Sequence, residues 1–190
     1  NKYRPKIILL INLPYGSIIQ KKDIIKAAQE RIKNGETVSL DSVARDIGLT
    51  KAGLVHHYPT KKSLMMGLVN DVVERWQLML DATPAKPNAE DRMMTYLRYA
   101  MSDEIDSSDF AFMADYKLKD ELYAKWAKQI EAWFNFYDIT DITRRSALMT
   151  VRLIADGAWF DRGLGMLNIS VEERQSILDV SEKILKEGVK

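Results

Sequence analysis

The sequence predicts an all-α fold of about nine helices, in which a small N-terminal helix-turn-helix domain precedes a larger helical domain. Two observations support this fold class: apolar residues recur at helical spacing along most of the chain, and no segment shows sustained strand alternation. With 190 residues, of which 46% are apolar and 29% charged, the chain is long enough for one small module and one larger core. The boundaries that we expect are 1–19 for an N-terminal extension, 20–64 for the helix-turn-helix domain and 65–190 for the larger domain.

Helix start and stop residues divide the first part of the chain into four helices. Apolar residues at helical spacing predict a helix from Gln20 to Lys33, which Asn34-Gly35 ends. Ser39 opens a short helix that Gly48 terminates as a left-handed cap. Thr50 and Thr60 are the expected N-caps of the next two helices, Lys51 to His57 and Lys61 to about Leu80.

The rest of the chain predicts five more helices. Residues 81–88 contain two prolines and are expected to form a connection, and Ser170 with Glu173 forms a capping box for the last helix. The expected helices run from Asn88 to Met101, near Phe110 to Tyr116, from about Asp120 to Tyr137, from Asp141 to Met166, and from Ser170 to about Lys186.

The N-terminal extension has a short apolar run, Ile7 to Ile11, behind three basic residues. This arrangement mimics a signal peptide, but the run is too short and residues 13–16 do not form a small-residue cleavage site. It is also far too short for a membrane span, so we expect a cytoplasmic protein with no membrane partner. Residues 1–19 could be a natural extension, the product of an upstream start, or residues added for expression.

The composition argues against an enzyme. The chain has no Cys, which excludes disulfides, thiolate catalysis and cysteine–zinc sites. The two His are adjacent, at His56 and His57, so a catalytic triad or a multi-His metal site has almost nothing to draw on. No Gly-rich phosphate loop is present. We therefore expect no catalytic residues, no metal and no cofactor.

Charge is distributed unevenly along the chain. Residues 1–64 contain 12 Lys/Arg and 5 Asp/Glu, a net charge of +7, whereas residues 65–190 contain 16 and 22, a net charge of −6. A basic N-terminal segment followed by an acidic remainder indicates that only the N-terminal segment binds a polyanion, although chance clustering would give the same uneven charge.

Residues 39–58, SLDSVARDIGLTKAGLVHHY, have the pattern of a helix-turn-helix motif. Ala44 is small where the two helices cross, and Ile47, Leu49 and Leu54 can close a miniature core beneath an exposed second helix.

The flanking sequence sharpens this interpretation. Gly53 to Val69, GLVHHYPTKKSLMMGLV, resembles the signature of the TetR family of bacterial transcriptional regulators, in which a Leu-Tyr-x-His-Phe-like sequence is followed by a Ser/Thr-Lys turn and a long connecting helix. The residues on those positions are Leu54, His57, Tyr58, Thr60, Lys61 and Leu64. The resemblance covers about residues 20–69. Val55 stands where the family usually has Tyr, so a DNA contact commonly made there is missing, and His56 is a candidate substitute.

The motif and the resemblance give nine candidates for contact with double-stranded operator DNA: Ser39, Thr50, Lys51, Ala52, Gly53, His56, His57, Tyr58 and Lys61. Thr50 has an alternative role as an N-cap, and His57 and Tyr58 as packing residues. Lys61 lies in the first turn of a helix, where the dipole disfavours a cation unless a phosphate is near.

The larger domain holds all nine Met, all four Trp and all five Phe of the chain. Most of these residues are expected in a core, but flexible Met beside rigid aromatics also suits a cavity for an apolar or aromatic molecule, and the resemblance implies such a cavity. The expected lining residues are Met93, Leu97, Met113, Trp126, Trp133 and Trp159. The acidic residues from Asp103 to Asp109 are expected in a solvated loop. Asp156 could pair with Arg152, line the cavity or face solvent.

The resemblance implies a homodimer interface formed by the last two helices, and Ala155, Gly157 and Ala158 allow close helix packing there. The sequence therefore predicts a TetR-type regulator, expected to be a repressor, that binds a palindromic operator as a dimer and is released by a small apolar or aromatic effector. The alternative is a TetR-like DNA-binding protein with no small-molecule inducer, which would have a solid body.

Overall fold

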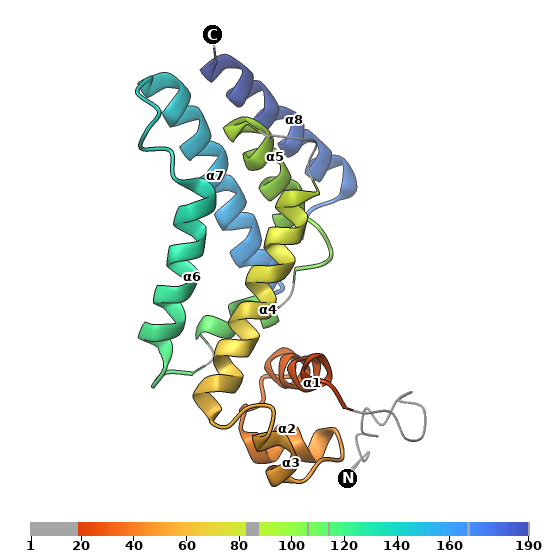
Figure 1. Ribbon diagram of the computed structural model, residues 1–190. Coiled ribbons are helices and arrows are strands. Elements are labelled where there is room, and N and C mark those ends of the chain that lie inside the picture. Colours follow the sequence, from red (N-terminus) through yellow and green to blue (C-terminus); the bar gives the residue numbers. More distant parts are fainter. Residues whose placement is uncertain (1–18, 83–87, 106, 114, 167, 190) are drawn as a thin grey trace.

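The computed structural model describes residues 19–82, 88–105, 107–113, 115–166 and 168–189, and in this part of the chain every regular element is a helix (Figure 1). It contains eight α-helices and one 3₁₀ helix, η1, which takes the place of the short helix expected near Phe110 to Tyr116. The prediction of an all-α fold is therefore confirmed. The expected extension at residues 1–19 lies almost wholly outside the described residues, as does most of the connection at 81–88. The elements are α1 Lys21–Lys33, α2 Leu40–Asp46, α3 Lys51–Val55, α4 Lys61–Asp81, α5 Ala89–Ala100, η1 Ser107–Met113, α6 Lys119–Phe134, α7 Ile142–Gly163 and α8 Val171–Gly188.

Several helices begin at the residues that local chemistry favours. The side chains of Ser39, Thr60 and Ser170 each accept a hydrogen bond from the backbone N–H three residues later, at the starts of α2, α4 and α8. Such a bond satisfies one of the free N–H groups of the first helical turn. Gly48 has φ +70°, a left-handed conformation that costs glycine little, and it turns the chain between α2 and α3.

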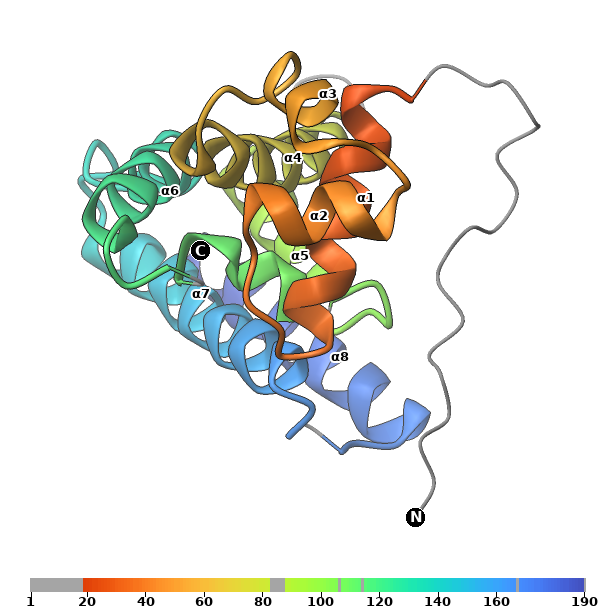
Figure 2. The same ribbon diagram turned by 90° about the horizontal axis from the view of Figure 1, so that it is seen from below.

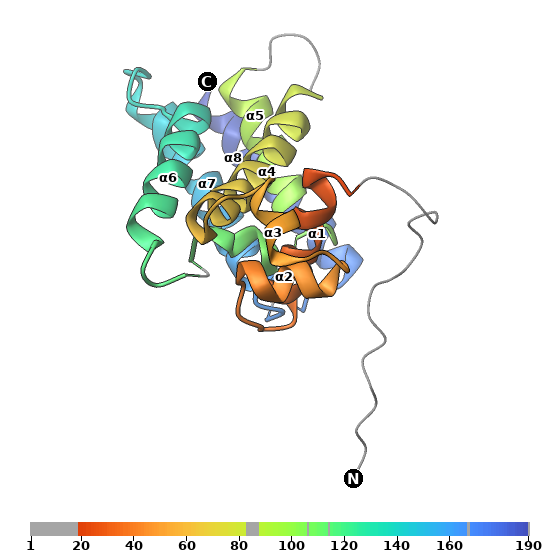
Figure 3. The same ribbon diagram turned by 60° about the horizontal axis from the view of Figure 1, so that its bottom comes forward.

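The first three helices form a small module at one end of the molecule (Figure 1). Ile24 of α1, Val43 of α2 and Leu54 of α3 are completely buried and form its core. Figures 2 and 3 show α2 and α3 on the outer side of this module, away from the body.

Helix α4 is the long connection between the module and the body. Its 21 residues bury one face along the whole length, from Leu64 near the module to Trp76 in the body. At 1.5 Å per residue the helix is about 30 Å long, so it reaches from one end of the molecule deep into the other. Trp76 lies at the centre of an aromatic cluster, with Tyr96, Trp126, Trp133 and Trp159 rings at centroid distances of 5.0 to 5.8 Å.

The body has two parts. Helices α5, α7 and α8 pack against one another, while α6 packs on α4 and η1 (Figure 1). Ala155 and Ala158 are buried inside the chain, Ala158 with 7% of its surface exposed, whereas Gly157 is exposed. Of the three small residues expected at a dimer interface, only Gly157 therefore faces outward. Among the described helices, none has the length and apolar character that a membrane crossing needs.

Candidate functional site

The helix-turn-helix presents a short second helix at the surface. Helix α3 is held by Leu54, which is buried, and by the backbone N–H of Leu49, which donates to the carbonyl of Ala44 at 2.8 Å. Lys51, Ala52 and His56 are exposed on this helix and the turn that follows it.

The other candidates for DNA contact also stabilise the fold, as helix caps or as packed side chains. Thr50 caps α3, because its hydroxyl accepts from the backbone N–H of Gly53 at 3.1 Å, and Ser39 caps α2 in the same way. His57 is half-buried. Tyr58 is buried, and its ring packs so closely on α4 that a Cβ at Gly67 would lie 2.8 Å from it. Burial, together with the charge of Asp71, raises the pKa of the Tyr58 phenol.

Lysines of this region form ion pairs within the chain. The Lys51 ammonium lies 2.9 Å from an Asp41 carboxylate oxygen, and Lys61 pairs with Asp115 across the boundary between the module and the body. Asp115 also accepts from the backbone N–H of Lys117 at 2.9 Å. The hydrogen bond from Lys61 is the main cause that holds the pKa of Asp115 below its usual value. Lys61 is thus anchored to the segment that follows η1.

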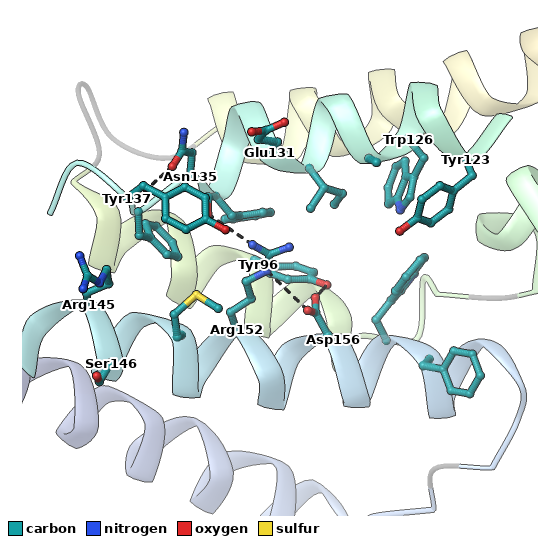
Figure 4. A pocket seen from close by; sticks show the side chains of 17 residues that line it. Tyr96, Tyr123, Trp126, Glu131, Asn135, Tyr137, Arg145, Ser146, Arg152 and Asp156 are labelled. Carbon is teal, nitrogen blue, oxygen red and sulfur yellow. Dashed lines mark hydrogen bonds and ion pairs between the residues drawn. The ribbon is translucent and has the colours of Figure 1, made fainter. Parts of the chain in front are cut away.

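A cavity of about 690 Å³ lies between α6 and α7, with Tyr96 of α5 among its lining residues (Figure 4). Figure 4 shows Tyr123 and Trp126 at one end, and Tyr137, Asn135 and Arg145 at the other. The remaining residues around it are Ala127, Ile130, Glu131, Phe134, Phe136, Ser146, Met149, Arg152, Asp156, Trp159 and Phe160.

Polar contacts occupy the middle of this cavity. The Tyr96 hydroxyl donates to Asp156 at 2.5 Å, and the Arg152 Nε lies 3.5 Å from the other oxygen of the same carboxylate. Burial and the neighbouring Asp156 raise the pKa of Tyr96 well above its usual value, so this phenol remains a proton donor. Asp156 both pairs with Arg152 and lines the cavity, with 41% of its side chain exposed. The sequence holds no local sign of the Tyr96–Asp156 contact, because 60 residues separate the partners.

Two of the six expected lining residues, Trp126 and Trp159, line this cavity. Met93 and Leu97 do not, since both are completely buried in the core, and Met113 has half of its surface exposed on η1. The Trp133 side chain stacks on Trp76 and donates its indole N–H to Gln77 at 2.7 Å. It lines a second, smaller cavity of about 340 Å³.

The 3₁₀ helix η1 lies between this cavity and the module. On one side, the Phe110 ring lies 4.6 Å from the ring of Trp159, which lines the cavity. On the other side, Asp109 accepts a hydrogen bond from Arg75 of α4 at 2.7 Å. The expectation of a solvated loop was wrong for Asp109, because its side chain is 1% exposed and is stabilised by this guanidinium.

The polar chain continues from Arg75 to α1. Asp71 receives hydrogen bonds from Arg75 at 3.2 Å and from Gln29 at 2.6 Å. Burial disfavours the charged form of Arg75, but Asp109 more than offsets this, so the pKa of the guanidinium is raised. Hydrogen bonds therefore connect Gln29 in the module with Asp109 in the body.

Comparisons with known proteins agree with this architecture. Residues 90–180 match the family model of the tetracyclin repressor-like C-terminal domain. A Rhodococcus protein assigned to the TetR family of transcriptional regulators is 17% identical, covers 87% of this chain and 97% of its own, and superposes with a TM-score of 0.64. No protein among those with curated functions matches the chain.

Two further solved structures share the fold. The multidrug binding protein EbrR, solved with imidazole, is 15% identical, covers 93% of this chain and 97% of its own, and has a TM-score of 0.58. The flavonoid-responsive regulator FrrA is 17% identical, covers 89% of this chain and 92% of its own, and has a TM-score of 0.53. At these identities the likeness establishes the shared fold.

Proposed function

Since this chain belongs to the TetR family of transcriptional regulators, we propose that it is a repressor that binds a palindromic operator as a dimer and leaves it when a small aromatic effector fills the cavity between α6 and α7. The observation that carries this proposal is the cavity itself, which has a volume in the range of small-molecule sites and largely aromatic walls. A regulator without an inducer would need no such space. The similar structures include a multidrug binding protein and a flavonoid-responsive regulator, which supports the proposal of an aromatic effector.

DNA contact is proposed for α3 and the residues around it. The exposed side chains of Lys51, Ala52 and His56 reach the base edges of the major groove, and Gly53 allows close approach. The N-termini of α2 and α3, with the hydroxyls of Ser39 and Thr50, bind phosphates. The other proposed contacts, also to phosphates, come from His57, Tyr58 and Lys61.

Dimerisation is proposed through α7 and α8. Ile142 and Leu153 of α7 and Leu164, its C-cap residue, are exposed and follow one another at intervals of three helical turns. They form an apolar stripe that the other described residues leave uncovered. Gly157 lies on the same face, where an added Cβ would meet nothing within 4 Å. A mid-helix glycine costs about 1 kcal/mol relative to alanine. Close approach of a second α7 would explain why glycine stands there.

Release is proposed to pass through η1. The Phe110 ring lies against Trp159. An effector that displaces Trp159 therefore also moves Phe110, and η1 moves with it. Because Asp109 is bonded to Arg75, a shift of η1 changes the position of α4 relative to the body. The two recognition helices of a dimer would then no longer match successive major grooves.

The test fills the cavity and leaves the DNA-binding module unchanged. Ala127 of α6 lines the cavity, so Ala127→Trp should occupy it, whereas Ala124→Trp places the same side chain on the exposed side of α6. The operator is first selected from random duplex DNA by the wild-type protein. A panel of flavonoids and other planar aromatic compounds is then screened for release of that operator.

We expect both variants to bind the operator like the wild type, and only Ala127→Trp to resist release. Retained release in Ala127→Trp would place the effector elsewhere. Failure of the wild-type protein to select any duplex sequence would refute the regulator itself.

A further inference from the structure

Two arginines and two carboxylates line the cavity, and only one of each is paired with the other. Arg152 is paired with Asp156, but Arg145 donates one bond at 3.0 Å to the backbone carbonyl of Ile139 and forms no ion pair with any described carboxylate. Glu131 lies across the cavity on α6, is exposed, and makes no ion pair with Arg145. The half-buried guanidinium of Arg145 is therefore a positive charge in the cavity wall that no carboxylate of the described residues compensates.

The cavity is also divided along its length. At one end the rings of Trp126 and Trp159 are 5.7 Å apart. Toward the other end, Arg152 extends to the backbone carbonyl of Phe134 at 3.4 Å, and Arg145 lies two further turns along α7. Figure 4 shows this order, with Trp126 at one end, Arg152 and Asp156 in the middle, and Arg145 at the far end.

The spacing sets the length of a molecule that would use both ends. Arg152 and Trp159 are seven residues apart on one helix, which corresponds to roughly 10 Å along its axis. Arg145 stands as far again in the opposite direction. The full distance from Trp159 to Arg145 is therefore roughly 20 Å along the axis. A bare aromatic ring would leave the guanidinium end empty, whereas a ring on a chain of about a dozen atoms would span the two halves.

We infer that the effector of this cavity is an elongated aromatic carboxylate, with its ring beside Trp126 and Trp159 and its carboxylate on the guanidinium of Arg145. A guanidinium binds a carboxylate through two parallel hydrogen bonds, a geometry that no neutral group reproduces. Asp156, which Tyr96 also holds, compensates the charge of Arg152 in the middle of the cavity, so Arg145 is the arginine of the lining that is left for a ligand. A cationic aromatic would instead meet two guanidinium groups. Of the two carboxylates, Asp156 already has its partners, and Glu131 is exposed to water, which weakens its attraction for a cation.

This inference rests on the proposed function, since it names the chemistry of the effector for the same cavity. It is tested by binding alone, with no DNA present. The probes are 12-phenyldodecanoate, 12-phenyldodecanamide and 12-phenyldodecylamine, which have a chain long enough for this distance, share the ring, and differ in the charge of the terminal group. Isothermal titration calorimetry of the full-length protein gives each dissociation constant.

The carboxylate should bind about 10- to 100-fold more tightly than the amide, the range expected for a hydrogen-bonded charged group, and the amine should bind most weakly. Arg145→Gln should remove the preference for carboxylate over amide. Arg145→Lys, which keeps the charge, should retain part of it. Arg98→Gln removes an exposed arginine of α5 outside the cavity and should leave all three constants unchanged.

Equal binding of the carboxylate and the amide, tightest binding of the amine, or no binding by any probe would overturn the inference. So would a carboxylate preference that survives Arg145→Gln. A neutral probe that binds as tightly as the carboxylate would overturn the anionic effector and leave the ligand-released repressor standing, because operator release is tested separately with Ala127→Trp. The two proposals therefore fail separately.

Discussion

Replacing Asp115 with Asn is expected to strengthen DNA binding. In the free protein Asp115 holds the ammonium group of Lys61, which the proposed DNA complex assigns to a phosphate. Lys61 cannot bind Asp115 and a phosphate equally well at the same time, so breaking the ion pair with Asp115 reduces the free energy of DNA binding. Asn retains the carbonyl oxygen that accepts from the backbone N–H of Lys117, so the local turn should persist.

The structure limits the size of this effect. The Lys61 side chain is 42% exposed and that of Asp115 10%, and pairs with one exposed partner are worth at most about 1 kcal/mol. Two protomers on one operator would contribute up to about 2 kcal/mol, or roughly 25-fold in affinity at low salt. The gain should shrink as salt screens the phosphate contact.

Fluorescence anisotropy with the selected operator over a series of salt concentrations measures this gain. Asp120→Asn is the matched control, because it removes the same charge from an exposed position in the first turn of α6. Adding Lys61→Ala to Asp115→Asn should abolish the gain. The reasoning is refuted if Asp115→Asn binds no more tightly than Asp120→Asn, or if the gain survives without Lys61.

The remaining predictions concern stability and assembly. Because the pKa of Asp115 is lowered in the folded protein, its contribution to stability is fully present above the unfolded value of about 3.9 and is lost as pH falls through the lower folded value. Urea unfolding should therefore separate wild type from Asp115→Asn at neutral pH and cease to separate them once the pH has fallen below the lowered folded value. A constant difference at all pH values would contradict this. Asp109→Asn should lower the free energy of unfolding by about 1–3 kcal/mol, because Arg75 loses a buried charged partner, and an unchanged urea midpoint would show that the pair contributes nothing. Leu153→Arg should yield monomers in sedimentation, because it places a charge on the proposed α7 interface. Leu78→Arg, at a similarly exposed leucine of α4, should leave the dimer intact. A monomeric wild type, or dimers that survive Leu153→Arg, would argue against the α7 interface.

The helix-turn-helix module could be predicted closely because its signals are local. Ser39, Thr50 and Thr60 bond to backbone groups three residues away, and Gly48 adopts its left-handed turn within the same stretch. Such contacts are encoded in neighbouring residues, so a single sequence displays them. The one overestimate is α3, expected to reach His57, which ends at Val55 as the chain turns toward Tyr58.

The cavity could be predicted only in part, because helical periodicity shows which face of a helix is apolar and not what lies opposite. Met93 and Leu97 share the apolar face of α5 with Tyr96, yet only Tyr96 reaches the cavity. Arg145 appears polar and unremarkable in sequence, and its place in the cavity wall depends on how α6 and α7 diverge. The burial of Asp109 likewise depends on Arg75, which lies 34 residues earlier.

The central claim is that filling the cavity weakens operator binding, and reciprocal titration tests it most directly. An aromatic compound that binds the wild-type protein is titrated with and without saturating operator, and the operator with and without saturating compound. The account predicts that both affinities fall by the same factor, typically about 5- to 150-fold, because linkage is reciprocal. Equal affinity of the compound for the free and the operator-bound protein would contradict the account, since such a compound cannot shift the equilibrium between them.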